Sequence, residues 1–210
     1  MNRQTELHKL VMKLQLDQMK ELKEWITKAE ERLSQLQTPV NPDSLTASLE
    51  TTEQLLNDLE SQQSVVASIS NFIMVDTGEV KDIGSLEEEL SALGDRWVSL
   101  CNMTEQRYDY LQIINSLCSQ FKEESQLLES WIVKVESRMK HLEMETENID
   151  KELLEQQGIE VMEAEVALED YEKKLLLVGD VGQELQDRLN PSEEEFVRFI
   201  TSKLEDIEDR

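Results

Sequence analysis

A heptad pattern that keeps its phase from residue 85 to residue 142 constrains the fold of this chain more than any other feature. The stretch contains no proline, and Gly94 is its one glycine. Alternating steps of four and three from Leu86 reach seventeen positions, of which fourteen are apolar. This pattern is typical of one α-helix with a continuous apolar seam. At ~1.5 Å per residue the helix would be roughly 85 Å long, so it should join two compact parts.

Four other helices are predicted from apolar periodicity and from residues that stop helices. They cover residues 3–37, 42–73, 151–189 and a last stretch after Pro191. Pro39 and Pro42 oppose continuation of the first helix. Gly179 and Gly182 weaken the helix at 151–189 and could mark a break in it. The fold class predicted is all-α.

Capping residues predict where three of the helices begin. Asn41 offers a side-chain oxygen to the free N–H groups of the second helix, and Pro42 suits its first position. Ser85 and Glu88 have the S-x-x-E spacing of a capping box at the start of the long helix. The same spacing recurs at residues 192–195, before the last helix.

Three polar residues, Thr104, Arg107 and Ser125, interrupt the apolar seam of the long helix. They bracket the region where this helix would pass from one compact part to the next. Each contributes less apolar burial than the leucines around it. Bending of the long helix is therefore predicted to start there.

The chain contains an internal repeat with an offset of 106 residues. Residues 23–33 match residues 129–139, and each stretch has a tryptophan directly before a seam isoleucine. The position that corresponds to Trp97 in the second copy of the repeat depends on how the two copies are aligned. It lies one position past Arg210 if the Asp-Arg pairs are aligned, and at Leu204 if the capping boxes are aligned.

A three-helix unit of this length, whose last helix continues into the first helix of the next, resembles the spectrin repeat, and the resemblance covers essentially the whole chain. Trp25, Trp97 and Trp131 fill three of the four tryptophan positions that mark the family. Within it, residues 7–32 and 93–107 resemble most the rods of the dystrophin and utrophin family.

The resemblance implies tandem three-helix spectrin-like bundles that share a continuous linker helix. Residues 1–118 would form the first repeat, including the tail of a preceding helix. Residues 119–210 would form the second repeat, which is shortened because its third helix is short. The expected structural core consists of Trp25, Trp97, Trp131, Leu86, Leu90, Leu93, Phe121 and Ile132.

Charge and cysteine content restrict the class of partner. The net charge of −25 argues against nucleic acid and against anionic membrane surfaces, because both attract Lys and Arg. Residues 1–37 differ, with seven basic and six acidic side chains. Cys101 and Cys118 lack the spacing of a metal-binding pair, so free thiols in a reducing compartment are expected.

No pattern for catalysis, phosphate binding or zinc binding is found in the sequence. The Glu runs at 87–89 and 193–195 lack the spacing of a calcium loop, and they suit helix N-termini. His8 and His141 lie too far apart in sequence to pair within one helix. The chain is therefore expected not to be an enzyme, with no catalytic, cofactor-binding or metal-binding residue, no cofactor and no small-molecule substrate.

The leading functional prediction is a structural rod segment that sets distance and transmits tension within a longer protein. Its partners would be adjacent repeats of the same chain. The resemblance implies a linker between the actin cytoskeleton and a membrane complex. No signal run or membrane-length apolar stretch is present, so a cytoplasmic, cytoskeletal location at the inner face of a membrane is expected. The plasma membrane is favoured over the nuclear envelope.

Two alternatives remain open at this point. A recruitment module would bind F-actin or another plasma-membrane or nuclear-envelope partner through a repeat surface. Charge opposes actin and lipid contacts for residues 38–210, since both partners are anionic. The second alternative is self-association through an apolar groove left open by the short last helix.

Overall fold

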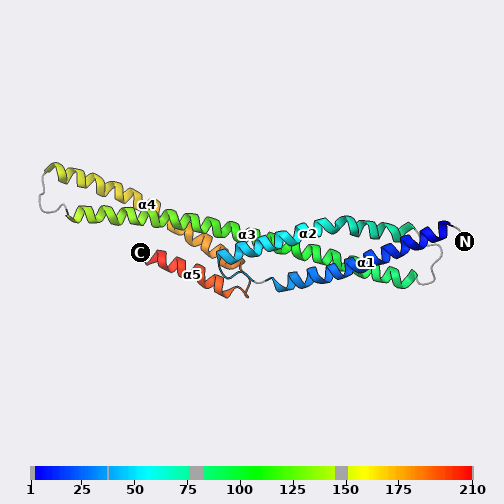
Figure 1. The fold of residues 1–210 in the computed structure, drawn as a ribbon. Helices are drawn as coiled ribbons and strands as arrows, with labels where there is room; N and C mark the ends of the chain where they lie inside the picture. Colours follow the sequence, from blue (N-terminus) through cyan, green and yellow to red (C-terminus); the bar gives the residue numbers. More distant parts are fainter. Residues whose placement is uncertain (1–2, 37, 76–82, 145–150, 210) are drawn as a thin grey trace. The chain divides into compact units, whose positions relative to one another are not determined.

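The chain is all-helical in the computed structural model, which describes residues 3–36, 38–75, 83–144 and 151–209. No strand occurs within these ranges. The helices, in chain order, are α1 (Arg3–Gln35), α2 (Pro42–Val75), α3 (Ile83–Met144), α4 (Lys151–Arg188) and α5 (Glu194–Glu208) (Figure 1). The predicted all-α class is confirmed, and the heptad stretch forms one helix of 62 residues.

The start of α2 is capped as the sequence predicts. Pro42 is its first residue, and the side-chain oxygen of Asn41 accepts a hydrogen bond from the Ser44 N–H at 2.8 Å. The Ser44 hydroxyl oxygen accepts in turn from the N–H groups of Val40 and Asn41, at 2.9 and 3.0 Å. These bonds satisfy donors that a helix start would otherwise leave without an intrahelical acceptor.

The two predicted capping boxes are wrong. α3 begins at Ile83, so Ser85 lies inside the helix and not at its cap. α5 begins at Glu194, with Glu193 at the N-cap position. The Glu193 side chain is buried and accepts the N–H of Asn190 at 2.8 Å, outside the helix. The S-x-x-E spacing cannot show which of several neighbouring glutamates turns inward.

Packing of the Cα trace divides the chain into two compact units. Unit 1 consists of Met1–Gln37 and Thr46–Gln112, and unit 2 of Thr38–Leu45 and Ile113–Arg210. The connection after α1 and the first turn of α2 thus group with the later part of the chain. α3 contributes to both units and passes from one to the other between Gln112 and Ile113. A repeat boundary after residue 118 stays a prediction.

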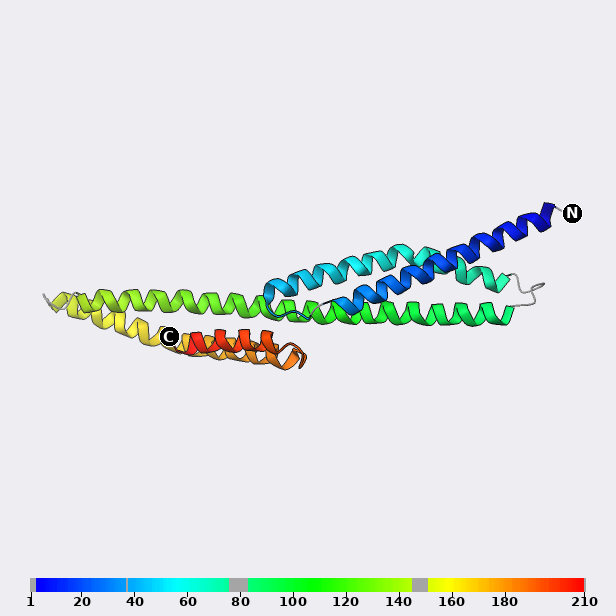
Figure 2. The ribbon, with the colours of Figure 1, turned by 60° about the horizontal axis from the view of Figure 1, so that its bottom comes forward.

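In unit 1, α1, α2 and the first part of α3 run side by side around an apolar core (Figures 1 and 2). Buried residues on α1 recur at helical spacing, which places one face of that helix in the core. On α2 the buried face includes Leu55 and Ile69. The core cluster comprises Met19, Leu22, Ile26, Ala29, Leu55, Leu59, Ile69, Leu93 and Leu100.

Two threonines are fully buried in unit 1 without leaving a polar group unsatisfied. The hydroxyl of Thr104 donates to the carbonyl of Leu100, and that of Thr52 donates to the carbonyl of Ser48, both at 2.7 Å. Backbone acceptors one turn earlier thus satisfy these hydroxyls. Ser125 differs, because its buried hydroxyl oxygen has no hydrogen-bond partner within the described part of the chain.

Unit 2 is built mainly from the second part of α3 with α4 and α5. α5 packs along the later part of α4 (Figure 1). Its apolar face is strongly buried, which matches the regular spacing of its apolar residues. The buried apolar residues of these three helices include Phe121, Leu128, Ile132, Val178, Val181, Leu185, Leu189, Phe196, Ile200 and Ile207.

Gly182 lies close to side chains of both α5 and α3. A Cβ atom there would lie 2.9 Å from Cδ1 of Leu204 on α5 and 3.2 Å from Cε2 of Phe121 on α3. A Cβ atom at Gly179 would meet nothing within 4 Å. α4 continues through both glycines, so the predicted break is wrong. Gly182 is a packing residue, whereas Gly179 is a solvent-facing weak point of the helix.

Valine substitutions at these two glycines should separate packing from helix propensity. Gly182→Val should destabilise unit 2 by about 1–3 kcal/mol, because the branched side chain overfills the contact with Leu204 and Phe121. Gly179→Val is the matched control and should be neutral or slightly stabilising, since valine has a somewhat higher helix propensity than glycine. Urea unfolding followed by circular dichroism measures both. Equal midpoints for the two variants would contradict the assignment of Gly182.

Candidate functional site

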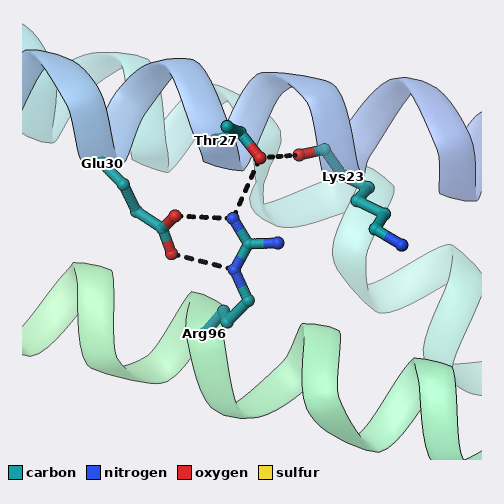
Figure 3. Close-up of polar contacts among 4 residues, drawn as sticks. All are labelled: Lys23, Thr27, Glu30 and Arg96. Atoms are coloured by element: carbon teal, nitrogen blue, oxygen red, sulfur yellow. Dashed lines mark hydrogen bonds and ion pairs between the residues drawn. The ribbon is translucent and has the colours of Figure 1, made fainter.

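Arg96 of α3 makes polar contacts with two residues of α1 (Figure 3). Its guanidinium forms a two-bond fork with the Glu30 carboxylate of α1, with Nε–Oε1 at 3.0 Å and Nη2–Oε2 at 2.5 Å. Nη2 also donates to the hydroxyl oxygen of Thr27 at 3.0 Å. That hydroxyl donates to the backbone carbonyl of Lys23 at 2.9 Å. Arg96, Glu30 and Thr27 are called the polar clamp below.

Electrostatics and geometry both favour the clamp. The hydrogen bond from Arg96 lowers the pKa of the Glu30 carboxyl below its usual range, and the same bond raises the pKa of Arg96. Both side chains are partly exposed, so water screens the pair and its contribution to stability is modest. A bidentate arginine fork has one favourable geometry, which lets it select one register between α1 and α3.

Two further contacts tie α1 to its neighbours in unit 1. Arg32 of α1 pairs with Asp58 of α2 at 2.7 Å, and both side chains are partly exposed. Arg107 of α3 donates to the backbone carbonyl of Leu36 at 3.5 Å. Arg107, which interrupts the predicted seam, thus reaches the carboxyl end of α1. Heptad periodicity indicated none of these cross-helix pairs. The one sequence signal was the position of Arg96 directly before a predicted core tryptophan.

Tryptophan contacts occur in both units but with different partners. Trp25 of α1 and Trp97 of α3 lie with ring centroids 6.0 Å apart and planes at 40°. Trp131 of α3 stacks on Tyr171 of α4, with centroids 4.3 Å apart and planes at 20°. Pairs at these separations add roughly 0.5–1.5 kcal/mol beyond area burial. Apolar periodicity does not show that the Tyr171 ring meets Trp131.

The predicted core residues occupy positions of different burial. Leu93, Phe121 and Ile132 are buried. The other predicted members with described side chains are half-buried, namely Leu90, Trp25, Trp97 and Trp131. Trp25, Trp97 and Leu90 pack against the buried cluster of unit 1. The side chain of Leu86 lies outside the described ones. What each residue contributes to stability stays a prediction.

The two thiols are free and poorly suited to reaction. Burial raises the pKa of Cys101, and it raises that of Cys118 to about 12. A thiol that keeps its proton at neutral pH is a weak nucleophile and a weak metal ligand. Over the described ranges, no three His, Cys, Asp or Glu side chains gather as a metal site would require. No helix in those ranges combines the length and apolar character needed to cross a membrane.

Residues 12–112 match the family model of the spectrin repeat and belong to that family. Utrophin of Rattus norvegicus is 34% identical over 227 residues, which cover 100% of this chain and 6% of utrophin. Dystrophin, isoforms A/C/F/G/H, of Drosophila melanogaster is 28% identical over 109 residues, which cover 50% of this chain and 3% of that protein. The predicted resemblance is confirmed. The chain spans only a small part of the length of these relatives.

A double-mutant cycle tests the polar clamp. Arg96→Gln and Glu30→Gln, singly and together, should give a coupling energy of about 0.5–1 kcal/mol at neutral pH, because the fork is bidentate but screened. The same cycle on the exposed pair Arg198 and Glu194 of α5 serves as the control and should give less. Urea unfolding followed by tryptophan fluorescence measures the clamp cycle, and circular dichroism measures the control. A coupling energy no larger than the control would contradict the clamp.

The pH dependence of this coupling has a definite sign. The pKa of Glu30 is lowered in the folded state from its ordinary value of 4.5. The stabilisation is therefore fully present above pH 4.5 and is lost as pH falls through the lower folded pKa. The measured coupling should shrink towards zero in acid. A coupling that grows on acidification would show that the carboxylate charge is not its source.

Proposed function

We propose that this chain is a rod segment of a cytoskeletal linker protein. The observation that supports the proposal most directly is the continuity of α3, which runs from Ile83 to Met144 and contributes to both units. A helix shared by two units cannot kink sharply at their boundary without losing backbone hydrogen bonds. Force applied to one unit would therefore reach the other through the helix. The spectrin repeat match at residues 12–112 supports the same role.

The proposed cellular location of the linker is based on its similarity to known relatives. Utrophin and dystrophin are the proteins that the chain resembles over all or half of its length. We place the linker between the actin cytoskeleton and a membrane complex, in the cytoplasm at the inner face of the plasma membrane. Adjacent repeats would be its constant partners, and neither a small-molecule substrate nor a nucleic acid is required. A rod needs no catalytic group, so no enzyme activity is proposed.

A proline at the boundary between the units tests transmission through α3. Gln112 is exposed, so Gln112→Pro removes no core side chain but costs about 3 kcal/mol or more of helix stability. Gln112→Ala is the matched control, since alanine favours the helix. Each unit can be followed separately by its own tryptophans. One background carries Trp131→Phe and reports unit 1, and the other carries Trp25→Phe with Trp97→Phe and reports unit 2.

In the parent backgrounds, and in those with Gln112→Ala, the two reporters should unfold at the same urea concentration. With Gln112→Pro, the two midpoints should separate, because each unit then unfolds by itself. Coincident midpoints in the proline variant would show that α3 does not couple the units. Separate midpoints in the parent backgrounds would count equally against the proposal.

The alternative function, recruitment of F-actin, is favoured by one observation. Residues 1–37 hold seven basic against six acidic side chains, whereas the rest of the chain is strongly acidic. Actin filaments are acidic, so any contact should use this stretch and should weaken with salt. Co-sedimentation with F-actin at low and high salt separates the two functions. A rod segment should pellet weakly at both salt concentrations, and strong pelleting that salt abolishes would favour recruitment.

A further inference from the structure

The outer side of α4 carries large apolar residues at positions where a solvated helix normally carries polar ones. Scattered apolar side chains are ordinary on a protein surface, whereas several along one side of a helix indicate an interaction site. Five such residues, called the outer stripe below, are Ile159 (60% exposed), Met162 (67%), Val166 (70%), Leu176 (69%) and Leu177 (41%).

The later part of α4 shows that this side of the helix stays open when α4 is packed against both neighbours. There Leu185 and Leu189 are buried, while Gln183, Glu184 and Asp187 remain exposed. Steps of seven residues back along the helix lead from these three polar positions to all five residues of the outer stripe. The outer stripe therefore lies on the side that a third helix leaves uncovered, and its exposure does not depend on how far α5 extends.

The densest part of the outer stripe has the spacing of a docking surface. Ile159, Met162 and Val166 follow one another at intervals of three and four residues, which makes them neighbours on the helix surface. Leu176 and Leu177 continue the same side about three turns later. Apolar anchors at this spacing are the contacts through which amphipathic helices are recognised. The shape of the surface thus favours a helical partner.

Charge around the outer stripe favours a basic partner. Glu163, Glu169 and Asp170 lie on the same side of α4, and all three are exposed. Lys173 also lies there, but it pairs with Asp170 at 3.6 Å. Between residues 152 and 172 the helix has eight acidic residues and no Lys or Arg. Like charges repel across an interface, so a second copy of this chain, with its net charge of −25, is disfavoured as the partner.

We propose that the outer stripe of α4 binds a basic amphipathic helix of another protein. The apolar side of that helix covers Met162 and Val166, and its Lys and Arg side chains meet the carboxylates at the margins. Apolar burial supplies most of the affinity, and the charges supply selectivity for a basic partner. Binding therefore weakens with salt without being abolished. The inference does not rest on the rod function, since a segment can hold a partner whether or not it transmits force.

A synthetic leucine–lysine peptide serves as the probe. Its leucines recur at intervals of three and four residues, so that they form one stripe when the peptide is helical. A second peptide has the same composition, in an order that spreads the leucines around the helix. Fluorescence anisotropy of the labelled peptides, titrated with the full chain, measures binding. The striped peptide should bind at least about tenfold more tightly, because it alone can bury its leucines together.

Paired variants distinguish the outer stripe from the pocket between α3 and α4. A Met162→Gln, Val166→Gln double variant should weaken binding of the striped peptide at least about tenfold, because two apolar contacts are lost. The matched control is Val161→Gln, Leu168→Gln, which changes two half-exposed residues that line the pocket, and it should bind as the parent does. Circular dichroism checks that both variants are folded. Equal losses in the two variants, or a larger loss in the pocket variant, would overturn the proposal.

The charge contribution has its own pair of variants. Glu163→Gln with Glu169→Gln should weaken binding severalfold at low salt and reduce its salt dependence. Glu53→Gln with Glu60→Gln changes two exposed residues of α2, alters the net charge equally, and should have a smaller effect. Equal effects would indicate attraction to net charge alone and would overturn the proposal. It would also be overturned by a parent chain that fails to bind the striped peptide, or by self-association that Met162→Gln with Val166→Gln abolishes.

Discussion

Burial of the apolar seam along α3 is the requirement on which the rest of the structure depends. A helix of 62 residues with one continuous apolar stripe is not stable alone in water. α1 and α2 cover the first part of the stripe in unit 1, and α4 and α5 cover part of the remainder in unit 2. Polar seam residues are tolerated where the backbone satisfies them, as it does for Thr104. The buried faces of the other helices are thus set by α3.

Apolar burial stabilises the packed helices but does little to fix the register between them, because it is not directional. Contacts with a defined geometry supply register, and the two units use different ones. In unit 1 the fork from Arg96 to Glu30 joins α3 to α1, beside the ring contact of Trp25 with Trp97. In unit 2 the close approach at Gly182 and the stacking of Trp131 limit how the helices can slide. Such contacts fix which residues of neighbouring helices lie opposite one another.

Periodicity predicted the helices well, and it predicted side-chain partners poorly. The long helix was expected at residues 85–142 and spans Ile83–Met144, because heptad spacing depends only on local order along the chain. The polar clamp could not be predicted, since Glu30 and Arg96 are 66 positions apart and many other charged pairs were equally available. On α2, Leu55 is buried whereas its neighbour Leu56 is only half-buried, and periodicity does not decide between them. Adjacent leucines leave the choice of buried face to tertiary packing.

The reactivity of the buried Cys118 thiol reports local opening of unit 2. While the unit is folded, the thiol is covered and its pKa of about 12 keeps it protonated. Local opening exposes it to water and returns its pKa towards the ordinary value, which restores its reactivity. The rate at which a thiol reagent labels Cys118 therefore measures how often unit 2 opens, without any engineered probe.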